Sequence, residues 1–71
     1  MQKLTIEEVS KILELARAEH AAHSYLRMGQ CFFNFLYDLH PDIANSIRGT
    51  EYDPFYDSKK LQECALFITE Y

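Results

Sequence analysis

The segment from Tyr25 to Leu39 constrains the fold most, because apolar side chains cover most of the circumference of the helix that it would form. These apolar residues are Tyr25, Leu26, Met28, Cys31, Phe32, Phe33, Phe35, Leu36, Tyr37 and Leu39. A helix that is apolar on all sides is either central to a bundle or shared between subunits. In a chain of 71 residues, the other short helices can hardly wrap such a helix completely. We therefore expect a central aromatic-rich helix and a homo-oligomer.

A first helix is predicted over residues 6–22. Thr5 and Glu8 have the spacing of a capping box, in which each side chain accepts a hydrogen bond from the backbone amide of the other residue. Leu4 precedes the cap and can pack on Val9 as a hydrophobic staple. The positions that recur at the spacing of one helical face are Val9, Ile12, Leu13 and Ala16.

The sequence leaves open how the first helix joins the central one. Ser24 is a suitable N-cap for a separate second helix that runs to Leu39. The alternative is one continuous helix over residues 6–39, since no glycine or proline precedes Gly29. In either case His40-Pro41 ends the central helix, because proline disfavours helical geometry at the residue before it.

A short third helix is predicted from Pro41 to Arg48. Proline fits the first turn of a helix, where its missing amide hydrogen is not needed. The apolar face of this helix consists of Ile43, Ala44 and Ile47. Gly49 suits the left-handed position that follows a helix, and Arg48 suits the negative end of the helix dipole.

The loop "GTEYDPFYD" over residues 49–57 leads into a fourth helix. Asp53-Pro54 suits the first two positions of a type I turn, and the Asp53 carboxylate can accept backbone amides further along it. Asp57 or Ser58 can cap the last helix, and Phe55 would fill the space between the second and fourth helices. The apolar stripe of that helix is Leu61, Cys64, Ala65 and Ile68, joined by Phe67 and Tyr71.

These elements predict an all-α fold, in which residues 1–71 form a single domain with about four helices and a structured loop before the last. The apolar fraction of 48% is enough for a core and argues against disorder. Cys31 and Cys64 lie in apolar helical stripes, where we expect buried, reduced thiols. We find no apolar signal segment and no run long enough to span a membrane, which favours a cytoplasmic location.

The sequence offers no good candidate for catalysis. His20 and His23 would share a helix face, but a metal site would need further ligands such as His40 or a cysteine. We therefore expect solvated histidines and no metal or cofactor. A catalytic cysteine is equally disfavoured, because a thiol in an apolar stripe does not ionise readily. The prediction is that the chain is not an enzyme.

The loop could act as a structural clasp or as a binding patch. In the second case Tyr52 and Tyr56 would be exposed, with Glu51 and Asp53 as an acidic rim. Tyrosine is enriched in interface hot spots, and an acidic rim would select a partner with a basic surface. The net charge of −4 weighs against nucleic-acid binding, which needs a basic surface.

Two stretches, "YLRMGQCFFNFL" and "RGTEYDPFYDSKKLQECALFI", resemble small proteins encoded in bacteriophage and prophage genomes. Those proteins carry an arginine-x-glycine-glutamine helix and a glycine-threonine-x-x-aspartate-proline-phenylalanine loop. The matching residues here are Arg27, Gly29, Gln30 and Asn34 in the helix and Gly49, Thr50, Asp53, Pro54 and Phe55 in the loop. The resemblance implies a phage accessory protein that binds a bacterial host protein, such as a defence system, and inhibits or modulates it without catalysis. The alternative function is a small transcriptional regulator or adaptor at DNA.

The matching residues also suggest how the loop is held. Gly29 would allow another helix or the loop to approach closely. Arg27 and Gln30 could reach the carboxylates of Asp53 or Asp57, or the loop carbonyls. We define the clasp by the residues expected to hold the loop shut, which are Arg27, Gln30, Gly49, Pro54, Phe55 and Asp57.

Overall fold

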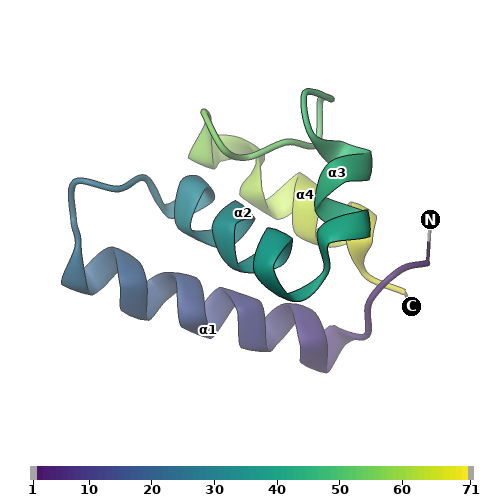
Figure 1. The fold of residues 1–71 in the computed structure, drawn as a ribbon, viewed down its shortest axis with the longest axis horizontal. Coiled ribbons are helices and arrows are strands. Elements are labelled where there is room, and N and C mark those ends of the chain that lie inside the picture. The colour runs from purple at the N-terminus through teal and green to yellow at the C-terminus, as the bar shows by residue number, and fades with distance from the viewer. Residues whose placement is uncertain (1, 71) are drawn as a thin grey trace.

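The computed structural model describes residues 2–70 and is all-α, as the sequence predicts. Its helices are α1 (Ile6–Ala22), α2 (Met28–Leu39), α3 (Pro41–Ile47) and α4 (Leu61–Ile68), with a 3₁₀ turn η1 (Ser58–Lys60) before the last. Figure 1 shows α1 running along one side, α2 lying against it, and α3 and α4 on the far side of α2. Helix α2 is therefore the central element.

The start of α1 is confirmed in detail. The Thr5 amide donates to Oε1 of Glu8 at 2.9 Å, and the Glu8 amide donates to Oγ1 of Thr5 at 3.2 Å. This reciprocal pair satisfies two amides that a helix start otherwise leaves without partners. Leu4 and Val9, the expected staple, are both buried in the core. Local sequence therefore fixes where α1 begins.

Of the two alternatives for the junction of α1 and α2, the one with two separate helices is correct, and only its N-cap at Ser24 is wrong. Helix α1 ends at Ala22, so the chain does not continue as one helix, and α2 begins at Met28 with Arg27 rather than Ser24 as its N-cap. The intervening turn is closed by the Leu26 amide, which donates to the His23 carbonyl at 2.9 Å. Nδ1 of His20 also lies 2.7 Å from the Leu26 carbonyl oxygen. These contacts hold a tight turn that a capping rule alone does not reveal.

Helix α2 is wrapped more completely than we expected from so short a chain. Cys31, Phe32, Phe33 and Leu36 are all buried within the single chain. Its exposed residues are Asn34, Tyr37, Asp38 and Leu39, at its C-terminal half. The incomplete wrapping that led us to expect a homo-oligomer is thus largely absent among the described residues, and self-association stays a prediction.

Helix α3 follows α2 after a single residue, His40, and begins at Pro41 as predicted. It ends at Ile47, with Arg48 as C-cap. Gly49 has φ of 75°, the left-handed conformation expected after the helix. The direction of the chain into the loop therefore depends on this glycine.

The segment before α1 and the segment after α4 lie side by side (Figure 1), an arrangement that the sequence did not indicate. Leu4 and Thr69 form an isolated parallel bridge, in which the Leu4 amide donates to the Ile68 carbonyl at 2.8 Å. The Glu70 amide donates in turn to the Leu4 carbonyl at 2.7 Å. These bonds tie the segment before α1 to the end of α4. Tyr71, which we assigned to the α4 stripe, lies outside the described residues.

Candidate partner-binding site

The clasp lies against the first turn of α2, where Gly29 leaves no room for a side chain. A Cβ atom on Gly29 would overlap the Pro54 carbonyl oxygen and would lie 3.1 Å from Cα of Ser58. The Gly29 amide also donates to Oγ of Ser58 at 2.9 Å. Gly29 is thus the point of close approach that we expected, and the element that approaches it is the loop.

Arg27 holds the clasp through a loop carbonyl rather than through a carboxylate. Its Nε donates to the Phe55 carbonyl oxygen at 3.1 Å. Its guanidinium carbon lies 5.8 Å from the centre of the Phe55 ring and 5.7 Å from that of Tyr56. Gln30 is half-buried on α2, and none of the hydrogen bonds of residues 2–70 joins it to the clasp.

Asp53 stabilises the loop from within. Its two carboxylate oxygens accept the amides of Gly49 at 2.8 Å and Phe55 at 2.9 Å. The Asp57 amide donates to the Pro54 carbonyl, so Pro54 begins the hydrogen-bonded turn rather than occupying its second position. Asp57 then accepts the Lys59 amide at 3.0 Å and caps η1. The Asp53 carboxylate, which we had placed on an acidic rim, therefore already accepts two backbone amides.

The two tyrosines of the expected binding patch lie in different surroundings. Tyr52 is half-buried and stacks on Phe67 of α4, with ring centres 3.9 Å apart and planes within 6°. Tyr56 is 81% exposed and contacts Phe55 edge to face. Glu51, between Thr50 and Tyr52, is exposed. Of the two rings, only Tyr56 presents most of its surface to solvent.

An open groove of about 490 Å³ runs between Tyr56 and the exposed side of α2. Its lining residues, which we call the aromatic groove, are Phe33, Asn34, Tyr37, Asp38, Arg48, Asp53, Phe55 and Tyr56. Phe55 is half-buried, packs against the core and meets Phe33 at 88°, with ring centres 5.8 Å apart.

The lining of the groove includes the guanidinium of Arg48 and the carboxylate of Asp38. The Arg48 guanidinium carbon lies 5.5 Å from the Phe33 ring centre and 5.2 Å from that of Tyr37. Asp38 is exposed and forms no ion pair with any residue in the described range 2–70. Tyr37 itself is 43% exposed. The groove therefore combines exposed ring surface with a carboxylate that accepts hydrogen bonds only.

The cysteines are poorly placed for catalysis. Both are buried and free. Burial raises the pKa of the Cys64 thiol to about 12, and the nearby charge of Asp53 adds to the increase. Burial also raises the pKa of Cys31 above its usual range. A thiol that stays protonated is a poor nucleophile, which agrees with the sequence prediction of inert thiols.

The histidines do not gather into a ligand set. Nε2 of His23 lies 3.9 Å from Oε1 of Glu19, while His20 contacts the Leu26 carbonyl. Among residues 2–70 there is no group of three or more histidines, cysteines or acids arranged to hold a metal ion. Nor is any helix within this range long and apolar enough to cross a membrane.

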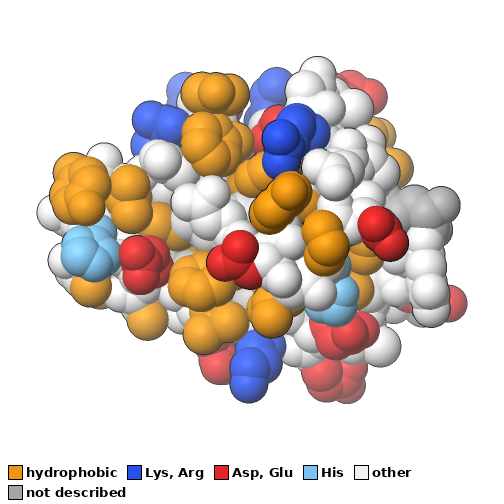
Figure 2. Space-filling view, in the orientation of Figure 1, with side chains coloured by type: hydrophobic (Ala, Val, Ile, Leu, Met, Phe, Trp, Pro, Cys, Tyr) orange, Lys and Arg blue, Asp and Glu red, His pale blue; other side chains and the backbone are white. Residues whose placement is uncertain are grey.

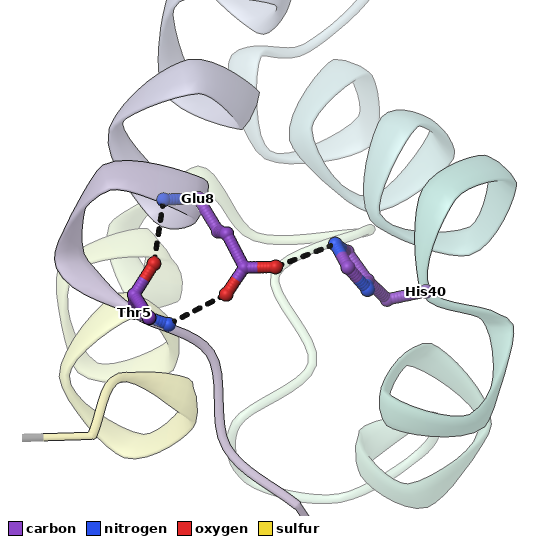
Figure 3. Close-up of polar contacts among 3 residues, drawn as sticks. All are labelled: Thr5, Glu8 and His40. Carbon is purple, nitrogen blue, oxygen red and sulfur yellow. Dashed lines mark hydrogen bonds and ion pairs between the residues drawn. The ribbon is translucent and has the colours of Figure 1, made fainter.

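A second groove, of about 660 Å³, lies between the start of α1 and the α2–α3 junction. Glu8 and His40 both line it. Figure 3 shows the Glu8 carboxylate reaching back to Thr5 with one oxygen and facing His40 with the other, at 3.8 Å from Nε2. Hydrogen bonds from the backbone and side chain of Thr5 lower the pKa of Glu8, and His40 contributes. This arrangement joins the α1 cap to the junction.

The face drawn in Figure 2 carries several small groups of apolar side chains separated by charged ones. No protein-family model, curated protein or solved structure matches the chain.

The sequence patterns predicted a binding patch in the loop only, and they did not predict the part of the groove formed by Tyr37, Asp38 and Arg48. The available signal was Tyr37 and Asp38, a tyrosine beside a charged residue near the end of a helix that is otherwise mostly apolar.

Proposed function

We propose that this chain is a non-catalytic binding domain that recognises a protein partner through the aromatic groove. The observation that carries the proposal is that one groove is lined by two exposed tyrosines, Tyr56 at 81% and Tyr37 at 43% exposure. The loop that forms one wall of this groove is held in place by hydrogen bonds of Asp53 and Arg27. Tyrosines contribute large contact areas at low entropic cost and are enriched among interface hot spots. A wall that is already ordered reduces the entropy lost on binding.

The resemblance to phage proteins supplies the setting of this proposal. The partner would be a bacterial host protein with a basic surface, met in the cytoplasm and inhibited or modulated by binding. Host defence systems are one class of such targets.

Three features favour this role over the DNA-binding alternative. A helix-turn-helix joins its helices by a turn of about three or four residues, whereas α2 and α3 are joined by His40 alone. The Arg48 side chain, the strongest candidate for a phosphate contact near α3, lies over the rings of Phe33 and Tyr37. The net charge of −4 also opposes association with DNA.

The test is capture of a partner on the immobilised protein. Variants substituted within the groove are compared with a variant substituted elsewhere on the surface. We expect Tyr56→Ala and Tyr37→Ala to lose a partner that the wild-type chain retains at physiological salt. The matched control is Tyr25→Ala, because Tyr25 is 80% exposed but does not line the groove. Retention of the partner by both groove variants, or equal loss in the control, would contradict the proposal.

A further inference from the structure

We propose that the aromatic groove receives an arginine side chain of the partner, which lies flat against Tyr37 and Tyr56 and pairs with Asp38. This inference rests on the proposed function and specifies the chemistry that the groove recognises. It follows from the ring surfaces, the free carboxylate and the charge around the groove.

The rings of this groove already bind guanidinium groups within the chain. Arg48 lies 5.2 Å from the centre of the Tyr37 ring, and Arg27 lies 5.7 Å from that of Tyr56. Both distances are within the range of about 6 Å for a cation over an aromatic face. The exposed surface of these two tyrosines remains available to a group with the same flat shape.

Asp38 supplies the charge that such a guest needs. It lies in the groove and is exposed, and it has no ion pair within residues 2–70. Asp53, the other acid of the groove, has both oxygens on backbone amides. Asp38 is therefore the carboxylate that can accept two parallel N–H bonds from a guanidinium.

The charges around the groove are negative in sum. Its lining contains Asp38 and Asp53 against Arg48. Close to it, Arg27 lies beside Tyr56, and exposed Glu51 lies next to Tyr52 in the loop. The whole chain carries a net charge of −4. Arginine fits better than lysine, because a guanidinium is planar and weakly hydrated and can stack and pair at the same time.

Titration of the isotope-labelled protein with short peptides, followed by NMR, tests this inference. The probes are the capped peptides Gly-Gly-Arg-Gly-Gly, Gly-Gly-Lys-Gly-Gly and Gly-Gly-Glu-Gly-Gly. We expect saturable shifts at the amides of Tyr37, Asp38 and Tyr56 with the arginine peptide, at an affinity at least severalfold above that of the lysine peptide. The glutamate peptide should leave these amides unchanged.

Asp38→Asn should weaken binding of the arginine peptide by about tenfold, the loss typical of one charge-assisted hydrogen bond. The matched control is Glu63→Gln, which changes the net charge equally at an exposed site on α4 outside the groove. Equal affinity of the arginine and lysine peptides would overturn the inference, as would equal effects of the two substitutions or preference for the glutamate peptide.

These outcomes are separable from failure of the proposed function. If a partner is lost on Tyr56→Ala but the arginine peptide does not bind the groove, the binding role stands and the arginine inference is wrong. If Tyr37→Ala and Tyr56→Ala both retain the partner as the wild-type chain does, the proposed function itself is wrong.

Discussion

Replacement of Gly29 by alanine should destabilise this protein, although the same change stabilises most helices. In an exposed helix interior, alanine is favoured over glycine by up to ~1 kcal/mol. Here the added Cβ would overlap the Pro54 carbonyl oxygen and lie 3.1 Å from both the Pro54 carbonyl carbon and Cα of Ser58. All of these are backbone atoms, so no side-chain rotation can relieve the contact.

The size of the effect follows from what must move. Pro54 is fully buried, and the residues beside it are held by Asp53 and Arg27. Overpacking of this kind costs about 1–3 kcal/mol. Separation of the loop from α2 would also weaken the bond from the Gly29 amide to Ser58, worth roughly 1 kcal/mol. After the helix gain is subtracted, we expect a net loss of about 1–3 kcal/mol in the free energy of unfolding.

Urea and thermal denaturation of Gly29→Ala measure this loss. For a domain of this size, 1 kcal/mol shifts the midpoint by about 4–8 °C, so we expect a decrease of roughly 5–20 °C. The control is Asn34→Ala, which is exposed on the same helix and should be neutral or slightly stabilising. A Gly29→Ala variant at least as stable as the wild type would refute the close packing of the loop on α2.

Three further predictions test other parts of the structure. Arg27→Ala should lower hydrogen-exchange protection of the loop amides by removing the Nε bond to the Phe55 carbonyl, and unchanged protection and thermal midpoint would contradict its tethering role. The pKa of Glu8 is lowered in the folded chain from 4.5, so the contribution of its carboxylate to stability is full above pH 4.5 and is lost as the pH falls through the lower folded-state pKa. The urea midpoints at pH 7 and pH 3 should therefore differ less in Glu8→Gln than in the wild type. Native protein should resist iodoacetamide at pH 8, because Cys31 and Cys64 are buried with raised pKa values, and rapid labelling that does not require unfolding would show that the thiols are accessible.

Sequence reasoning placed the candidate site only in part. It found Arg27, Gly29 and the loop, and it anticipated that Arg27 would bond a loop carbonyl or a carboxylate. It also treated Tyr52 and Tyr56 as one patch, whereas Tyr52 stacks on Phe67 of α4. The pairing of two rings far apart in the sequence depends on where α4 packs, and no local pattern specifies that.

The sequence by itself determined the ends of several elements. The Thr5–Glu8 capping box, the proline that begins α3 and the left-handed Gly49 all appear where they were predicted. Asp57 acts as a cap as predicted, but it caps η1 rather than α4, whose N-cap is Lys60. Each of these depends on contacts between residues only a few positions apart. Such contacts form from the local chain geometry whatever the rest of the molecule does.

Only the tertiary structure decided the features that join distant segments. These are the contact of Gly29 with Pro54, the bridge between Leu4 and Thr69, and the groove that Tyr37 and Tyr56 both line. Their partners are separated by many residues, so they meet only after the helices pack, and the packing is set by the combined burial of the core. The shape of the candidate site is therefore a consequence of that packing and is not encoded in any single stretch of the chain.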